Sequence, residues 1–329
     1  MFSVKIIISF ILTFLLAMVL SNSIIRLIKR IGIRQTTLFY VDNHNSKNGT
    51  PTMGGIIFIV PITIIALIYI KSITLIGSIA IFVMLSFSLI GFLDDFLKVK
   101  RMKNLGLKAY QKIIAQSLIS IVVALYCYYH YAIGSSVFIP FLDIYLDLKW
   151  WYIPFTFVVF IATTNSVNLT DGLDGLATKT AIAYFSTFLI ILILLNFKSP
   201  SQNTESLILF SSCTLGGLFA FLWQNAYPAK IFMGDTGSLA LGGGVACVAI
   251  FSKNPFLILV IGIIYVVTSI SVIMQVVSFK LTGKRIFKMA PLHHHLEYKG
   301  IKESKIVSYY TIITIFFGVI SVWDLIRTL

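Results

Sequence analysis

Polar side chains recur at every third residue where an apolar run ends, between Asn165 and Gly175; they are Asn165, Asn168, Asp171 and Asp174. Two carboxylates this close repel each other unless a cation, a cation-bridged phosphate or water offsets their charge. A helix turns about 100° per residue, so four side chains at this spacing cannot share one narrow face. The pattern predicts a helix that ends near Asp171 and restarts around Gly175, with polar groups converging from both sides of the break. A solvated loop with ordinary helix caps is the alternative.

Two adjacent carboxylates, Asp94 and Asp95, stand at the predicted C-terminus of another apolar segment. Negative charge at that position opposes the helix macrodipole. The pair therefore suggests a metal ion, a substrate cation or a catalytic proton. Lys98, one helical turn after Asp94, and Lys112 can either neutralise the acids or bind phosphate oxygens.

Asp235 lies among small residues, Gly234, Gly237 and Ser238, at the predicted start of a further apolar segment. Backbone N–H groups at a helix start can bind an anion while the carboxylate binds a cation. Phe232 is placed to stack on a flat ring, although an aromatic residue near a membrane interface is more often simply packed.

Two other motifs could contact phosphate groups. Lys47 and Thr52 flank a Gly-Thr-Pro turn, which could hold a phosphate or merely lead into a helix through a tight Gly-Gly contact. The three consecutive histidines from His293 to His295 cannot all reach one metal, because neighbouring side chains diverge in a helix or a strand. Contacts to a phosphate or a substrate carboxylate suit them better than zinc.

These motifs lie in a chain with the composition of a membrane protein. Of its 329 residues, 58% are hydrophobic and 12% are charged, and the mean hydropathy is +0.94, which excludes a soluble domain. We expect an all-α polytopic integral membrane protein with about ten transmembrane helices, organised as a single transmembrane catalytic domain over residues 1–329. The predicted spans are Val4–Ile25, Gly54–Ile70, Ile73–Leu93, Ile113–Ile133, Trp151–Asn168, Leu176–Asn196, Leu207–Trp223, Ser238–Ser252, Phe256–Phe279 and Ile306–Ile326.

The basic residues predict the orientation of these spans. Twenty of the 26 Lys and Arg residues follow odd-numbered spans, and the positive-inside tendency places such connections in the cytoplasm. Both termini should then face outward. The net charge of +14 makes anionic lipid head groups or phosphorylated substrates the natural partners. Nucleic acid is a poor partner, because basic residues between membrane spans are usually topology signals.

Every polar motif follows an odd-numbered span, so one active site on the cytoplasmic face could collect all five. Asp and Asn oxygens suit a hard cation such as Mg²⁺, and Lys and His beside glycine-rich turns suit phosphate oxygens. This combination predicts phosphoryl transfer at a membrane surface. A cation transporter lined by the aspartates is the alternative from another class, although transporters tend to place such residues near the bilayer midplane.

The chain resembles the polyprenyl-phosphate N-acetylhexosamine-1-phosphate transferases through three motifs, which are Gly91-Phe-Leu-Asp-Asp95, Asn165-Ser-Val-Asn-Leu-Thr-Asp-Gly-Leu-Asp-Gly175 and Phe232-Met-Gly-Asp-Thr-Gly-Ser238. Two more, Gly49-Thr-Pro-Thr-Met-Gly-Gly55 and Ala290-Pro-Leu-His-His-His-Leu-Glu297, are similar to those of members that use UDP-N-acetylmuramoyl-pentapeptide. The resemblance implies that undecaprenyl phosphate attacks the sugar-linked phosphorus of this donor, giving lipid I and UMP. The location implied is the bacterial cytoplasmic membrane. A sister transferase that uses UDP-N-acetylglucosamine is the alternative within the family.

The resemblance also implies roles for individual residues, with Mg²⁺ at Asp235. Together with the charge argument, it gives a catalytic set of Asp94, Asp95, Asp171, Asp235, Lys98 and Lys112. The implied substrate pocket comprises Lys47, Thr52, Asn168, Gly172, Leu173, Asp174, Asn225, Phe232, Gln275, Ala290, His293, His294 and His295. A lipid phosphate is already largely a dianion at neutral pH, so one-step displacement with Asp94 positioning that phosphate is favoured over a covalent aspartyl-phosphate route. Small residues in the spans permit a homodimer but do not predict one.

Overall fold

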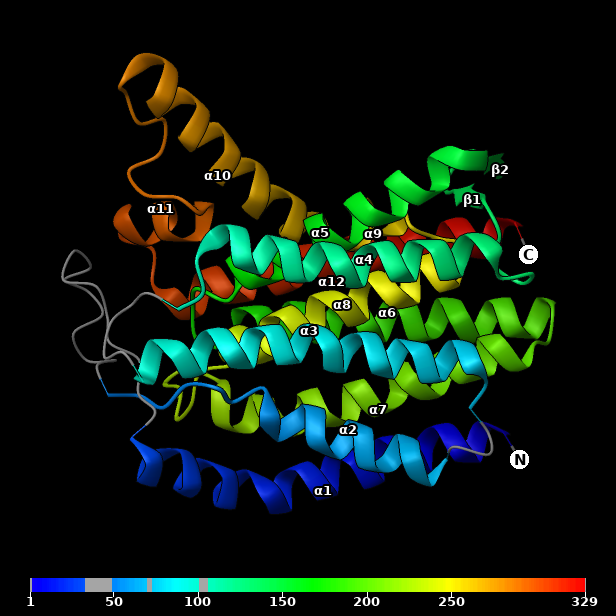
Figure 1. The fold of residues 1–329 in the computed structure, drawn as a ribbon, viewed down its shortest axis with the longest axis horizontal. Coiled ribbons are helices and arrows are strands. Elements are labelled where there is room, and N and C mark those ends of the chain that lie inside the picture. The colour runs from blue at the N-terminus through cyan, green and yellow to red at the C-terminus, as the bar shows by residue number, and fades with distance from the viewer. Residues whose placement is uncertain (1, 33–48, 70–72, 101–105, 329) are drawn as a thin grey trace.

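The computed structural model describes residues 2–32, 49–69, 73–100 and 106–328 as a helical bundle (Figure 1). Its α-helices are α1 Phe2–Ile31, α2 Ile56–Ile68, α3 Leu75–Lys100, α4 Ala109–Tyr129, α5 Tyr152–Thr170, α6 Leu176–Lys198, α7 Gln202–Asn225, α8 Gly234–Phe251, α9 Leu257–Ile261, α10 Ile263–Thr282, α11 Leu292–Tyr298 and α12 Glu303–Thr328. A short 3₁₀ helix, Lys149–Trp151, precedes α5.

Nine helices within the described ranges are long and apolar enough to cross a membrane, and α2 is a shorter apolar helix of 13 residues. The expected all-α polytopic membrane class is confirmed. The ninth predicted span, Phe256–Phe279, is not continuous as the sequence suggested, because the chain breaks at Gly262 between α9 and α10. A Cβ at Gly262 would lie 2.5 Å from the Ile258 carbonyl oxygen, so the absence of a side chain permits this bend. Beyond it, α10 inclines away from the bundle (Figure 1).

Helix α8 forms the centre of the bundle and packs against α3 and α5. All its residues from Thr236 to Phe251 are buried, as expected for a helix that is apolar or small on every face. A Cβ on Gly242 would lie 2.5 Å from the Thr164 Cα atom of α5, and one on Gly243 would lie 2.8 Å from the Phe87 ring of α3. The absence of side chains at this glycine run therefore lets α3 and α5 pack closely against α8.

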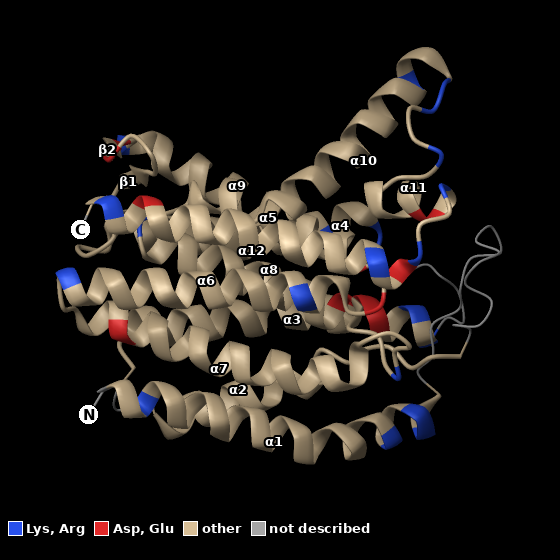
Figure 2. Cartoon of the chain, turned by 180° about the vertical axis from the view of Figure 1, so that it is seen from behind, with Lys and Arg blue, Asp and Glu red and all other residues tan. Residues whose placement is uncertain are grey.

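Both ends of the described chain lie at one end of the bundle, while α1 ends and α8 begins at the opposite end (Figure 1). Between α4 and α5 the chain forms a hairpin of two antiparallel strands, β1 Ser136–Ile139 and β2 Ile144–Asp147. Lys and Arg gather at the end that holds α11, next to a group of acidic residues (Figure 2). Which end faces the cytoplasm stays a prediction.

Candidate active site

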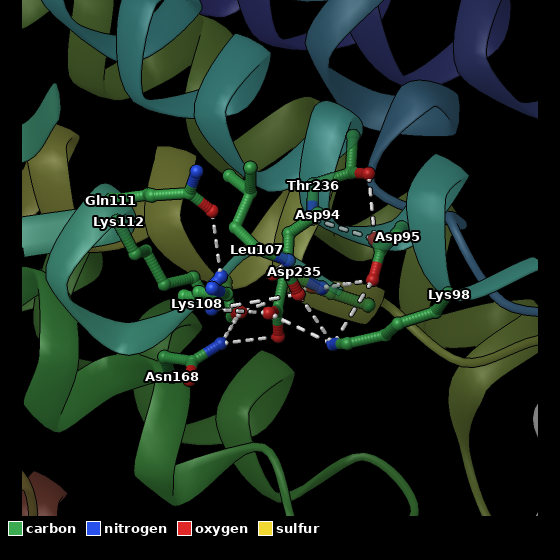
Figure 3. Close-up of polar contacts among 12 residues, drawn as sticks. Asp94, Asp95, Lys98, Leu107, Lys108, Gln111, Lys112, Asn168, Asp235 and Thr236 are labelled. Atoms are coloured by element: carbon green, nitrogen blue, oxygen red, sulfur yellow. Dashed lines mark hydrogen bonds and ion pairs between the residues drawn. The ribbon is translucent and has the colours of Figure 1, made fainter. Parts of the chain in front are cut away.

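Three carboxylates from two helices meet at the basic end of the bundle. Asp94 and Asp95 come from the end of α3, and Asp235 comes from the first turn of α8. One ligand oxygen from each lies within 4.8 Å of the others, and Figure 3 shows the three groups facing one another. The helices come this close because Gly91 lies directly against the backbone of Asp235, where a Cβ would clash. The sequence prediction that these motifs share one site is therefore correct for this part of the chain.

Asp95 caps the start of α8. Its Oδ2 accepts hydrogen bonds from the Thr236 backbone N–H at 2.9 Å and from the Thr236 hydroxyl at 2.8 Å, and its Oδ1 accepts one from the Asp235 N–H at 3.3 Å. A carboxylate at a helix N-terminus is stabilised by the unpaired N–H groups and by the macrodipole. The unfavourable position of Asp95 at the end of α3 is thus offset by its favourable position at the start of α8.

Two lysines connect the carboxylates. Lys98 Nζ lies 2.6 Å from Asp94 Oδ2 and 3.1 Å from Asp235 Oδ2, and Lys112 Nζ, from α4, lies 2.5 Å from the same Asp235 oxygen. Asn168 of α5 donates from Nδ2 to Asp235 Oδ1 at 2.7 Å. Asp235 therefore receives contacts from three other helices. Three negative charges face two positive ones in this carboxylate cluster.

The cluster has the donors that a hard divalent cation prefers. All three acids offer carboxylate oxygens, and their separation lets one ion reach all of them. Asp95 and Asp235 each accept three hydrogen bonds, whereas Asp94 Oδ2 is buried and, among the described residues, has only lysine ion pairs, so Asp94 retains the most capacity for an ion. The second Asp94 oxygen accepts from the Leu107 N–H at 2.8 Å, which fixes the carboxylate plane. The described residues thus fit a metal site. Within it, Asp235 is the carboxylate that residues of three other helices contact.

The break between α5 and α6 lies where the sequence predicts it. Helix α5 ends at Thr170, and Gly175 starts α6 with a left-handed φ of 74°, which glycine adopts without strain. Asp174 points to the loop before α8, where its Oδ2 accepts from the Ala229 N–H at 2.9 Å. Glu303, at the start of α12, accepts from the Asp174 N–H at 2.6 Å. The loop is therefore held from two sides.

Asp171 occupies the first position after α5 and faces the carboxylate cluster. The residue as a whole is partly exposed to solvent, but protein atoms surround its carboxyl group. Burial, followed by the negative charges of Asp235 and Asp95, raises the pKa of Asp171 to about 8. Burial therefore favours the neutral form of its carboxyl group, which can donate a hydrogen bond.

The three histidines diverge, as predicted. His293 is fully buried against Gly172, where a Cβ would clash with Nε2. His294 Nδ1 lies 2.7 Å from Glu297 Oε2, and His295 Nδ1 accepts from the Lys288 N–H at 3.1 Å. Burial, and then the neighbouring His294, lowers the pKa of His293 to about 3. The His293 ring is therefore neutral at physiological pH.

Asn225 and Gln275 use their side chains to hold loops. Asn225 is 2% exposed, accepts from the Thr178 hydroxyl at 2.6 Å and donates to the Ile231 carbonyl at 3.0 Å. Gln275 Nε2 donates to the Phe287 carbonyl at 3.0 Å, and its Oε1 accepts from the Phe287 N–H at 2.9 Å. In this structure both amides position backbone near the site.

The remaining predicted pocket residues lie around the same loops. Phe232 is half-buried, and its backbone pairs with Pro51 and Gly54 at 2.8 Å each, which places the buried Thr52 beside Gly234. Leu173 is buried in a small apolar cluster with α12. Ala290 precedes α11. Lys47 lies outside the described residues.

Sequence reasoning missed three contributors. Thr236 binds Asp95, Glu303 holds the Asp174 backbone, and Gln116 Oε1 accepts from Asn165 Nδ2 at 2.8 Å. The last contact joins α4 and α5 one helical turn from Lys112 and Asn168, two of the residues that bind Asp235. Only Thr236, inside the Asp-Thr-Gly motif, carried a local signal. Asn165 itself faces Gln116 and is not among the residues that contact the carboxylates.

The chain matches the model of glycosyl transferase family 4 over residues 77–253 and the phospho-N-acetylmuramoyl-pentapeptide-transferase signature 1 over residues 47–59. It is 46% identical over 317 residues to the phospho-N-acetylmuramoyl-pentapeptide-transferase of Clostridium perfringens (strain 13 / Type A), covering 95% of this chain and 96% of that protein. It is 45% identical over 286 residues to the protein of the same name from Clostridium novyi (strain NT), covering 87% of this chain and 86% of that protein. It is 50% identical over 272 residues to the one from Clostridium kluyveri (strain NBRC 12016), covering 83% of this chain and 84% of that protein. The chain therefore belongs to the phospho-N-acetylmuramoyl-pentapeptide-transferase family.

Proposed function

We propose that the chain transfers phospho-N-acetylmuramoyl-pentapeptide from its UDP-linked donor to undecaprenyl phosphate, giving lipid I and UMP. Family membership supports this reaction. The carboxylate cluster at one end of the membrane bundle is the observation that supports the position of the active site. The whole chain acts as a single transmembrane catalytic domain. Its basic end faces the cytoplasm and both termini face outward, which the distribution of Lys and Arg supports (Figure 2).

Mg²⁺ is the proposed cofactor, held by Asp235 and Asp94 with Asp95 behind them. Bound there, the ion would neutralise negative charge on the donor pyrophosphate. The oxygen-only donor set and the excess of one negative charge over the two lysines support this assignment.

The chemical step joins two anions. An oxygen of the lipid phosphate forms a bond to the sugar-linked phosphorus, and the bond from that phosphorus to the bridging oxygen of UMP breaks. The lipid phosphate needs no base, since its second pKa is near 6. Lys98 and Lys112 supply the positive charge that lowers the repulsion between nucleophile and donor, while Asp94 positions the lipid phosphate.

Asp171 suits a different task from the other acids. Because burial favours the neutral form of its carboxyl group, it can donate a hydrogen bond to a phosphate oxygen without adding repulsion. We place it beside the UMP leaving group, next to Gly172, Leu173 and Asp174. The nucleotide pocket then continues through Asn168, Asn225 and Phe232, with Lys47, Thr52, Gln275, Ala290 and the three histidines around the sugar and its peptide. Small residues on the helices permit close packing between two copies of the chain, and cross-linking would test for such a homodimer.

The test is UMP release by purified full-length protein with both substrates and Mg²⁺. Asp235→Asn should lower the rate at least about a thousandfold, because it removes a charge that Lys98, Lys112 and the cation share. Turnover of UDP-N-acetylglucosamine in place of the pentapeptide donor would move the chain to the sister reaction. Ion flux in sealed vesicles without UMP release would instead support a transporter.

A further inference from the structure

A cavity lined by basic and amide residues lies at the same end of the bundle, away from the carboxylate cluster. Its volume is about 480 Å³, and its lining residues are Asn22, Ile25, Arg26, Lys29, Gln224 and Lys230. We call it the basic cavity. The first four residues come from the last turns of α1, and the other two come from the end of α7 and the loop that follows. None of them contacts the three carboxylates.

The basic cavity concentrates positive charge without a carboxylate in its lining. Among the described residues, Arg26 donates to two neutral acceptors, the Asn22 carbonyl at 3.3 Å and the Ser23 hydroxyl at 3.5 Å. Within the part of the chain that the structure describes, neither Lys29 nor Lys230 forms an ion pair. The Lys230 N–H donates to the Gln224 carbonyl at 2.8 Å, which ties this loop to α7 and holds the third cation opposite α1. Three cations that converge from two elements favour an anionic ligand.

Gln224 adds a requirement for a hydroxyl group. Its side chain is 4% exposed, and Nε2 donates to the Ser21 hydroxyl oxygen at 3.3 Å. That hydroxyl already donates to the Met18 carbonyl at 2.8 Å, so it can only accept from Gln224, and the amide orientation follows. Gln224 Oε1 is left as a buried acceptor without a partner. A buried acceptor of this kind costs free energy until a donor satisfies it.

The position of the cavity points to a lipid. Helix α1 lies at the edge of the bundle (Figure 1), and the face of its last turns opposite the cavity exposes Leu27 and Ile31 by 56% and 58%. The cavity cations thus lie at the end of a helix whose outer face is apolar and exposed, where phospholipid phosphates lie and where basic side chains extend to reach them.

We infer that the basic cavity binds the phosphate of an anionic phospholipid whose head group carries a hydroxyl. Arg26, Lys29 and Lys230 contact the phosphate, and the head-group hydroxyl donates to Gln224. Phosphatidylglycerol has this chemistry. The site is separate from the carboxylate cluster and is occupied whether or not substrate is present.

The test titrates full-length protein in nonionic detergent with short-chain phosphatidylglycerol and measures binding by native mass spectrometry. Short-chain phosphatidylmethanol has the same charge without the hydroxyl, and phosphatidylcholine is the zwitterionic control. Inorganic phosphate and UMP are the soluble arms. Phosphatidylglycerol should bind more tightly than either other lipid, and the soluble anions should not compete at millimolar concentration.

Matched variants separate the cavity from general surface charge. Lys29→Gln should weaken phosphatidylglycerol binding about fivefold, the effect of one basic residue near an anionic lipid, whereas Arg30→Gln, the next residue on α1 but outside the cavity, should not. Gln224→Leu should erase the preference over phosphatidylmethanol. Equal losses in the Lys29 and Arg30 variants, or binding of all three lipids alike, would overturn the proposal. Saturation by inorganic phosphate alone would replace it with a soluble-anion site.

Discussion

The carboxylate cluster and the basic cavity lie at the same end of the bundle, but they balance charge in opposite ways. In the cluster, each of three acids lies within 4.0 Å of a lysine nitrogen. In the cavity, three cations converge without a described acid. A site that binds both a cation and an anionic substrate needs negative and positive side chains, whereas a site for a permanently bound anionic lipid needs only positive side chains. The difference indicates that the basic residues at this end of the bundle take part in binding in addition to setting the orientation in the membrane.

Removing Lys98 should disturb the balance most. It contacts all three acids, so Lys98→Gln should lower UMP release about a hundredfold through lost charge stabilisation. In the same variant, Mg²⁺ should raise the melting temperature more than it does in the unaltered protein, because one ammonium fewer competes for the oxygens. Lys100→Gln, two residues further along α3 and exposed, is the control and should change neither quantity. Equal effects in both variants would refute a special role for Lys98.

Asp95→Ala should act mainly on stability. The change removes the acceptor for the Thr236 N–H and hydroxyl at the start of α8, and losing such a cap costs about 2 kcal/mol. Thermal unfolding in detergent measures the loss. Asp95→Asn retains an acceptor oxygen and should recover part of it; if Asn and Ala were equally destabilised, the capping role would be wrong.

Acid should destabilise the histidine pocket. The pKa of His293 is about 6.5 unfolded and about 3 folded, so between these values the unfolded state binds the extra proton and stability falls as the pH falls. His293→Phe cannot be protonated, and relative to its own value at pH 7.5 it should lose about 2 kcal/mol less than the unaltered protein at pH 5. Unfolding at the two pH values tests this, and parallel losses would show that His293 is not the titrating group.

An acidic side chain placed in the basic cavity would give it both positive and negative groups, as in the carboxylate cluster. We expect the smallest effect on stability of the series. Gln224→Glu gives Arg26, Lys29 and Lys230 an internal partner, but it also removes the hydrogen bond to Ser21 and buries a carboxylate, so the free energy of unfolding of the detergent-purified protein should change by less than about 1 kcal/mol. The substitution should also weaken phosphatidylglycerol binding by competition. Gln202→Glu, at the far end of α7, gives the same charge change elsewhere. A variant that bound the lipid normally would argue against cations as the lipid contacts.

Local patterns predicted much of the active site. The break between Asp171 and Gly175 and the divergence of the three histidines are both present, because each depends on the periodicity of the local backbone. Roles that depend on a partner were harder to predict. Asn225, assigned to the substrate pocket from the family resemblance, also accepts a hydrogen bond from Thr178 of α6, and no spacing in the chain predicts that contact.

Composition and the lengths of apolar runs determined by themselves that this chain is a polytopic helical membrane protein, because the bilayer imposes one length and one polarity on every span. Only the tertiary structure decided that Asp95 stabilises the start of α8, that Glu303 holds the Asp174 backbone, and that Arg26 and Lys230 share a cavity. Each of these pairs joins residues at least 129 positions apart. Electrostatic and hydrogen-bond energies depend on distances of a few ångströms, and packing of the helices sets those distances.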